Sequence, residues 1–397
     1  MADATHHDDD STTTATEGTM APITAADALH EIRAAAERDA ATHASDFVIG
    51  TVGQDVPLEL IHAAGACAFR LRGNPEWDTA PADRYLGRGL DPATRSLLAG
   101  ILSGAFGPLD AIVVSSDCDA SQRLYYVLRE MRRVDPETTV PPVHLVDVLH
   151  LPRAASTRYT AAKLREFLDV LERWTGTRPD EAAIEHAVAE QDATRALQRA
   201  AMRLRSAVPA KMSGCDALAV FAAADRMPRP RYHECLEALV AGAADLPALS
   251  GRRIFLTGSN HDHHGVYREI EARGTVIVGE DHDHGELLAE RDVRSPGAPA
   301  EVLEAITLRY QHNGPTAQRA SIGARAAHTA AGIRRTSAEL LLSYVRLMDE
   351  APLWDFAAQR RESPVPAGVV VRQPYGRIHR GDLDRALTAP EATGVNE

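Results

Sequence analysis

Short apolar runs alternate with amphipathic segments along the chain, and the clearest example lies near the middle of its second half. Two runs of consecutive apolar side chains, at residues 254–256 and 276–278, flank an amphipathic segment. Continuous apolar runs favour strands that are buried on both faces, and apolar residues at helical spacing favour a helix. The pattern predicts a β-α-β unit whose helix is capped by Asn260 or Asp262 and ends at Gly274.

Ligands of such units gather at the carboxyl ends of the strands, so the turns at 257–260 and 280–284 are the candidate binding turns. Thr257, Gly258 and Ser259 form the first of these turns. A helix amino terminus directly after that turn would suit a phosphate group.

The amino-terminal half repeats the alternation of strand-like and helix-like segments. Apolar runs predict strands at 47–51, after Gly65, from 109 into the polar turn at 115–119, and from 144 to 150. Capping and proline signals predict helices from Thr24, from Pro57 to Gly65, from Asp91 to Leu102, and over 122–132.

The expected fold class is α/β, with two doubly wound, flavodoxin- or Rossmann-like parallel-sheet domains joined by a helical segment. A chain of 397 residues is too long for one ordinary core. The predicted division is a disordered lead (1–22), an amino-terminal α/β domain (23–153), a helical connector (154–247) and a carboxy-terminal α/β domain (248–397). In the last domain we expect a helix at 301–310, an Ala-rich helical stretch and a strand at 367–371, while residues 338–348 receive no assignment.

Composition narrows the classes of function. The net charge of -13 argues against a nucleic-acid-binding protein, because phosphate binding needs a basic surface. Apolar runs are too short to span a membrane, and the polar, acidic start differs from a signal peptide, so we expect a cytoplasmic protein. The four cysteines are scattered without a CxxC pair, which indicates separate thiols and not a disulfide framework.

Two groups of residues carry candidate chemistry. Cys118 follows a predicted strand and precedes a predicted helix, whose positive end is expected to favour the thiolate. Histidine and aspartate are dense at 261–264 and 281–284. These side chains could ligate zinc or iron, or form a polar rim that faces a substrate, and the sequence leaves both possibilities open.

Several motifs resemble the 2-hydroxyacyl-CoA dehydratase and benzoyl-CoA reductase family. Residues 57–66 match its P-x-E-L-I-x-A-A-G-A motif, and Arg70, Leu71 and Gly73 match the R-L-x-G that follows. In the second half, the T-G-S turn at 257–259 and the E-D-H turn at 280–282 match as well. The resemblance extends over residues 45–310 and implies the two-domain α/β fold.

The resemblance also implies a chemistry. Family members act on an acyl-CoA thioester through a [4Fe-4S] cluster that three cysteines hold, and a ketyl radical anion expels the hydroxyl group. In this chain Cys118 matches one ligand, Asp91 stands where a cysteine is usual, and Cys67 is a further possible ligand. No cysteine follows Cys235, so the third ligand of the family is absent.

The implied partners are an acyl-CoA substrate, a second family subunit or a second copy of this chain, and an ATP-dependent iron-sulfur activator. We assign Thr257, Gly258, Ser259 and Gly65 to cofactor binding. Three hypotheses follow. The chain is a divergent dehydratase subunit that pairs with a partner and retains the acyl-CoA cleft, with or without a cluster; or it is a non-catalytic partner subunit, and another chain carries the only cluster; or it carries out a different reaction, such as hydrolysis or a metal-assisted step, on the same scaffold.

Overall fold

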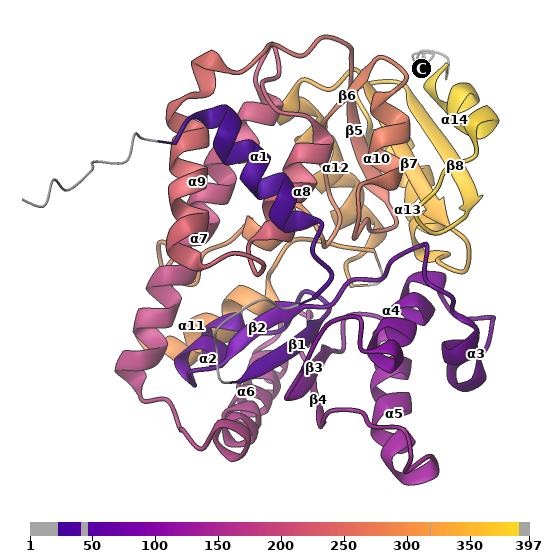
Figure 1. Ribbon diagram of the computed structural model, residues 1–397. Helices are drawn as coiled ribbons and strands as arrows, with labels where there is room; N and C mark the ends of the chain where they lie inside the picture. Colours follow the sequence, from indigo (N-terminus) through magenta and orange to yellow (C-terminus); the bar gives the residue numbers. More distant parts are fainter. Residues whose placement is uncertain (1–22, 41–46, 318, 389–397) are drawn as a thin grey trace, which may run out of the picture.

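The computed structural model describes residues 23–40, 47–317 and 319–388. The expected disordered lead at 1–22 lies outside the described residues. Figure 1 shows two sheets with flanking helices, and each sheet has four parallel strands. The prediction of an α/β fold with two parallel-sheet domains is therefore confirmed.

The first sheet has the strand order β2-β1-β3-β4. Its strands are β1 (Val48–Val52), β2 (Cys67–Arg70), β3 (Ala111–Ser115) and β4 (Val143–Val146). The accompanying helices are α2 (Leu58–Ala63), α3 (Ala80–Leu86), α4 (Pro92–Ser103) and α5 (Asp119–Val134). All residues of β1 and β3 are buried, as their continuous apolar runs predicted.

The second sheet has the order β6-β5-β7-β8, which is the same topology. Its strands are β5 (Arg252–Gly258), β6 (Thr275–Glu280), β7 (Leu340–Arg346) and β8 (Ala367–Gln373). The accompanying helices are α10 (Gly265–Glu271), η2 (Glu286–Ala289), α11 (Val302–Gln311), α12 (Ile322–Thr336), α13 (Ala351–Glu362) and α14 (Arg380–Leu387). The predicted β-α-β unit is confirmed as β5, α10 and β6, and β5 pairs with β6 in parallel.

The sequence assigned no element to the segment that forms β7. This strand is buried along its whole length between β5 and β8. The predicted cap of α10 is also wrong, because the helix begins after His264, whose side chain makes no capping hydrogen bond. Asn260 and Asp262 instead contact residues outside this unit.

Helices fill the segment between the sheets, as expected. They are α6 (Ala154–Thr175), α7 (Glu181–Ser206), α8 (Gly214–Ala223), α9 (Arg229–Ala241) and the short η1 (Ala243–Asp245). The first helix, α1 (Ala25–Ala36), packs on α8 and α9 and not on the first sheet. Apolar side chains of α6 and α11 share one core with β1 and β3, so a helix of the second half covers the first sheet.

No helix among the described residues is long and apolar enough to cross a membrane. In each sheet, the chain first adds a strand on one side of the starting strand and then crosses to the other side. The change of direction occurs between β1 and β3 in the first sheet and between β5 and β7 in the second. Doubly wound sheets bind ligands outside the carboxyl ends of the strands at such points.

Candidate functional site

The carboxyl ends of β3, β5 and β7 contribute to one cavity of about 460 Å³, which we call the sheet-edge cavity. Residues of both domains line it. They include Asp91, Asp117, Cys118, Gly258, Asn260, Asp283, Arg346, Asp349 and Trp354. The sequence predicted binding turns at 257–260 and 280–284, and both turns contribute to this cavity.

Cys118 lies at the start of α5, where its sulfur accepts a hydrogen bond from the backbone N–H of Ser121 at 3.4 Å. The Sγ atom also lies 3.2 Å from the Ser121 hydroxyl oxygen. Burial and the neighbouring Asp117 carboxylate nevertheless raise the pKa of the Cys118 thiol. Burial and the Asp117 charge therefore act against the effect that the sequence expects from the helix end.

Asp91 and Arg346 form an ion pair across the two domains. Arg346 Nε and Nη2 donate to the two carboxylate oxygens of Asp91 at 2.7 and 2.8 Å. Burial alone would lower the pKa of the Arg346 guanidinium, but Asp91 raises it well above its usual value. Asp91 also caps α4 by accepting from the N–H of Ala93, as the sequence predicted. Both carboxylate oxygens of Asp91, which the sequence proposed as a metal ligand, are therefore bound by Arg346.

Cys67, the third proposed metal ligand, lies in a different place. It begins β2 and lines a second cavity of about 470 Å³ on the side of the helices, which we call the helix-side cavity. Burial raises the pKa of its thiol to about 11. The structure thus brings Cys118 and Asp91 to one cavity and Cys67 to another.

The Thr257–Ser259 turn is held by hydrogen bonds within the protein. Thr257 Oγ1 accepts from Arg325 at 3.2 Å and from Gln359 at 2.9 Å. Ser259 Oγ accepts from the backbone N–H of Arg346 at 2.9 Å. Of the three residues, Gly258 lines the sheet-edge cavity.

The position of Gly258 requires a glycine. Its φ is +114°, and a Cβ atom there would lie 2.1 Å from the carbonyl oxygen of Tyr344. The following helix, α10, starts only at Gly265 and has seven residues. No helix therefore begins directly after this turn, so the unit lacks the helix amino terminus that would have suited a phosphate. Gly65, the other proposed cofactor-binding residue, ends α2 with φ +78° and lines the helix-side cavity.

The histidines of the two turns are dispersed. His282 Nε2 lies 2.6 Å from the Tyr267 hydroxyl oxygen, and the His261 ring packs beside it. Asp283 lines the sheet-edge cavity, whereas His284 lines the helix-side cavity. Within the described ranges, no three His, Cys, Asp or Glu residues are grouped so that they could hold a metal ion. The turns contribute a polar rim to two cavities and do not form one metal centre.

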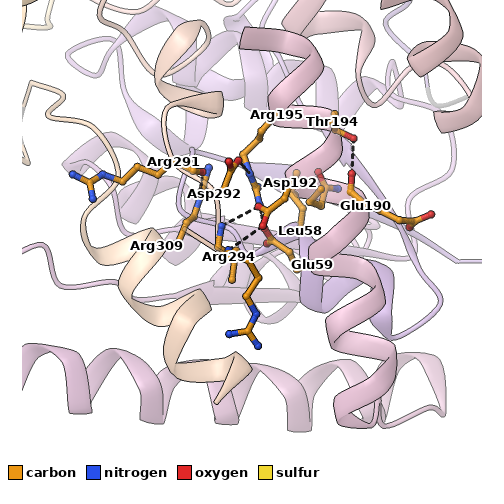
Figure 2. Close-up of polar contacts among 12 residues, drawn as sticks. Leu58, Glu59, Glu190, Asp192, Thr194, Arg195, Arg291, Asp292, Arg294 and Arg309 are labelled. Atoms are coloured by element: carbon orange, nitrogen blue, oxygen red, sulfur yellow. Dashed lines mark hydrogen bonds and ion pairs between the residues drawn. The ribbon is translucent and has the colours of Figure 1, made fainter. Parts of the chain in front are cut away.

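The sequence did not point to the network of polar contacts around Glu59, Asp192 and Arg195, which Figure 2 shows. Arg195 also lines the helix-side cavity. Arg195 Nη2 donates to Glu59 Oε1 at 2.9 Å, and the Tyr310 hydroxyl donates to Glu59 Oε2 at 2.8 Å. Asp192 accepts from the backbone N–H groups of Val293 and Arg294, each at 2.9 Å. Glu59, the acidic residue of the P-x-E-L-I motif, therefore joins α2 to α7 and α11.

Comparison with known proteins gives two similarities. A family model described as 2-hydroxyglutaryl-CoA dehydratase, D-component, matches residues 54–345, which is more than half of the chain. One of the subunits of benzoyl-CoA reductase from Thauera aromatica is 23% identical over 268 residues, which cover 65% of this chain and 66% of that protein. The match therefore spans slightly less than two thirds of the length of that relative.

Proposed function

The chain belongs to the 2-hydroxyglutaryl-CoA dehydratase D-component family, and from this premise we propose that it is a subunit of an enzyme of the 2-hydroxyacyl-CoA dehydratase and benzoyl-CoA reductase type. Its substrate would be an acyl-CoA thioester. The position of the sheet-edge cavity, outside the carboxyl ends of strands from both doubly wound sheets, supports this proposal.

The charges of the sheet-edge cavity suggest which part of the thioester would enter it. Its lining contains seven carboxyl side chains and two arginines, Arg123 and Arg346. An excess of negative charge disfavours the phosphates of coenzyme A and tolerates the uncharged acyl end. We therefore propose that the acyl end enters the cavity while the phosphates stay outside. Asn260 and the backbone at Gly258 would orient the carbonyl group.

The residues of this chain do not fit a [4Fe-4S] cluster. Such a cluster takes its protein ligands mainly from cysteine thiolates. The sheet-edge cavity offers one cysteine, Cys118, whose pKa is raised by burial. Both oxygens of Asp91 are engaged by Arg346, and Cys67 lies in the other cavity.

We therefore favour the hypothesis of a partner subunit without its own cluster, and the ion pair between Asp91 and Arg346 is the observation that carries it. Under this hypothesis a second family subunit carries the reducing chemistry, and a separate ATP-dependent activator would supply the electron to that subunit. The chain would bind and orient the thioester. The cluster-bearing hypothesis keeps one observation in its favour, since Cys118 and Asp91 line the same cavity.

An exposed apolar patch supports the proposal of a partner. Leu347 and Met348 follow β7, and Leu353 and Trp354 lie on α13; all four side chains are exposed. Met348 and Trp354 also line the sheet-edge cavity. Large exposed apolar residues beside a cavity are typical of contacts between subunits. We propose that the second family subunit packs over this patch and completes the site.

Isothermal titration with butyryl-CoA tests thioester binding in the sheet-edge cavity. Ala120 lines the cavity on α5, so Ala120→Phe should fill part of it and weaken binding at least tenfold. Ala182→Phe on the exposed surface of α7 is the matched control and should leave binding unchanged. Equal binding by wild type and Ala120→Phe would contradict this location for the substrate.

A further inference from the structure

The helix-side cavity differs in charge from the sheet-edge cavity, although the two lie on either side of the 283–284 turn. Six arginines line the helix-side cavity, against three acidic residues, Glu190, Asp225 and Asp262. Its volume of about 470 Å³ lies within the range of small-molecule sites. An excess of positive charge in a cavity of this size favours an anionic ligand.

Three of the six arginines are already neutralised. Arg195 pairs with Glu59, Arg226 with Asp225, and Arg229 with Glu190. The remaining three are Arg70, Arg72 and Arg309, and among the described residues none of them has a carboxylate oxygen at ion-pair distance. Carboxylates farther away still act on them, since the Arg70 guanidinium lowers the pKa of Asp283. Arg309 donates to the backbone carbonyl of Leu288 at 2.8 Å.

Arg72 and Arg70 lie two residues apart at the end of β2. Arg72 donates to the backbone carbonyl of Ala36 at 2.6 Å, and burial lowers the pKa of its guanidinium to about 10, so it stays charged at neutral pH. Arg70 is different because its Nε and Nη2 atoms are buried and have no hydrogen-bond partner among the described residues. Buried guanidinium N–H groups without partners are costly, and a ligand that accepts from them removes that cost.

The Nε and Nη2 atoms of a guanidinium present two parallel N–H groups that match the two oxygens of a carboxylate. The rest of the cavity wall is largely apolar, with Val56, Leu218, Phe221 and Met227 among its residues. We propose that the helix-side cavity is a binding site for a carboxylate on a compact apolar body, and that Arg70 anchors the carboxylate. This site is separate from the thioester site proposed above and does not depend on it.

Isothermal titration of the full chain with hexanoate tests the proposal, and uncharged hexanamide is the matched ligand. Hexanoate should bind, and hexanamide should bind at least tenfold more weakly, because it lacks the negative charge that would pair with the Arg70 guanidinium. Arg70→Gln should weaken hexanoate binding at least tenfold, and Arg70→Lys should retain part of it. Arg123→Gln, which removes an exposed arginine from the other cavity, should have no effect.

A second variant keeps the test valid if Arg70→Gln does not fold. Ala222 lines the cavity from α8, and Ala222→Leu should reduce hexanoate binding while Arg70 stays in place. Three results would overturn the proposal: equal binding of hexanoate and hexanamide, unchanged hexanoate binding in folded Arg70→Gln, or binding of adenosine 3′,5′-bisphosphate at this site in the absence of hexanoate binding. The last result would assign the arginines to coenzyme A phosphates.

Discussion

Arg346 at the end of β7 donates both Nε and Nη2 to the carboxylate of Asp91 at the start of α4, at 2.7 and 2.8 Å. The two residues come from different domains and lie 255 positions apart in the sequence. Arg346 also donates to the backbone and side-chain oxygens of Asn260 at 2.9 and 3.0 Å. One guanidinium therefore joins β7, the turn after β5 and the first domain at the edge of the sheet-edge cavity.

Removing Asp91 should destabilise the protein strongly. Asp91→Ala removes the nearer carboxylate partner of the buried Arg346 and leaves only Asp349, at 3.9 Å, so we expect a loss of about 3 kcal/mol in the free energy of unfolding. The matched control is Asp169→Ala, which breaks an exposed pair with Arg178 and should cost about 0–1 kcal/mol. Urea unfolding measures both. Similar losses for the two variants would show that the interdomain pair does not stabilise the fold.

Stability should fall at acidic pH partly because of Asp55. Its carboxylate accepts from Arg319 at 2.5 Å and lies 2.8 Å from His150 Nε2. Burial raises the pKa of Asp55, but Arg319 and His150 lower it by a larger amount, and the resulting pKa is about 2. The folded pKa is therefore below the unfolded value of about 3.9.

A carboxyl group whose pKa is lower in the folded state than in the unfolded state stabilises the fold at any pH above its unfolded-state pKa. This contribution to the free energy of unfolding is lost as the pH falls through the folded-state pKa. For Asp55 this contribution is about 2–3 kcal/mol and should disappear progressively between about pH 5 and pH 1. Urea unfolding of wild type and Asp55→Asn between pH 2 and pH 7 measures it. The difference in stability between the two proteins should shrink over that window, and a constant difference would refute the assignment to Asp55.

All four thiols should react slowly in the native protein. Burial raises the pKa of Cys67, Cys118, Cys215 and Cys235. Because the thiolate is the reactive form, iodoacetamide at pH 8 should label each native cysteine at least tenfold more slowly than it labels the urea-unfolded chain. Mass spectrometry resolves the sites. Rapid labelling of native Cys118 would restore the expectation that the amino terminus of α5 favours its thiolate.

The exposed patch beside the cavity should take part in the association of subunits. Trp354→Glu places a charge in the patch and should weaken association with a second family subunit, or with a second copy of the chain, at least tenfold. The control is Val208→Glu, since Val208 and Trp354 have the same exposed fraction of 73%. Sedimentation equilibrium gives both dissociation constants. An equal effect of the two substitutions would exclude the patch from the contact between subunits.

Local patterns were sufficient to predict both sheets except for one strand. The β-α-β unit, the capping of α4 by Asp91 and the place of Cys118 between β3 and α5 all depend on residues that are close in sequence. Strand β7 was missed because its apolar run follows an Ala-rich helix without a glycine or proline between them.

The missed features of the site depend on contacts between distant segments. Arg346 could not be paired with Asp91 from the sequence, since their approach needs both domains to be folded. The separation of Cys67 from Cys118 follows from the sheet order, because Cys67 begins the edge strand β2, whereas Cys118 follows the carboxyl end of β3 in the same parallel sheet. The effect of burial on the Cys118 thiol could not be predicted for the same reason, because burial is not visible in a local pattern.

Iron and acid-labile sulfide analysis of the anaerobically purified chain, after cluster reconstitution, tests most directly whether this subunit holds a cluster. Wild type and Cys118→Ala should be compared alone and in complex with a second family subunit. We predict no stoichiometric iron or sulfide in the isolated chain, and identical iron content for the two complexes, with any cluster residing in the partner. Stoichiometric iron and sulfide in the isolated wild-type chain, lost in Cys118→Ala, would contradict the account and assign this chain a cluster of its own.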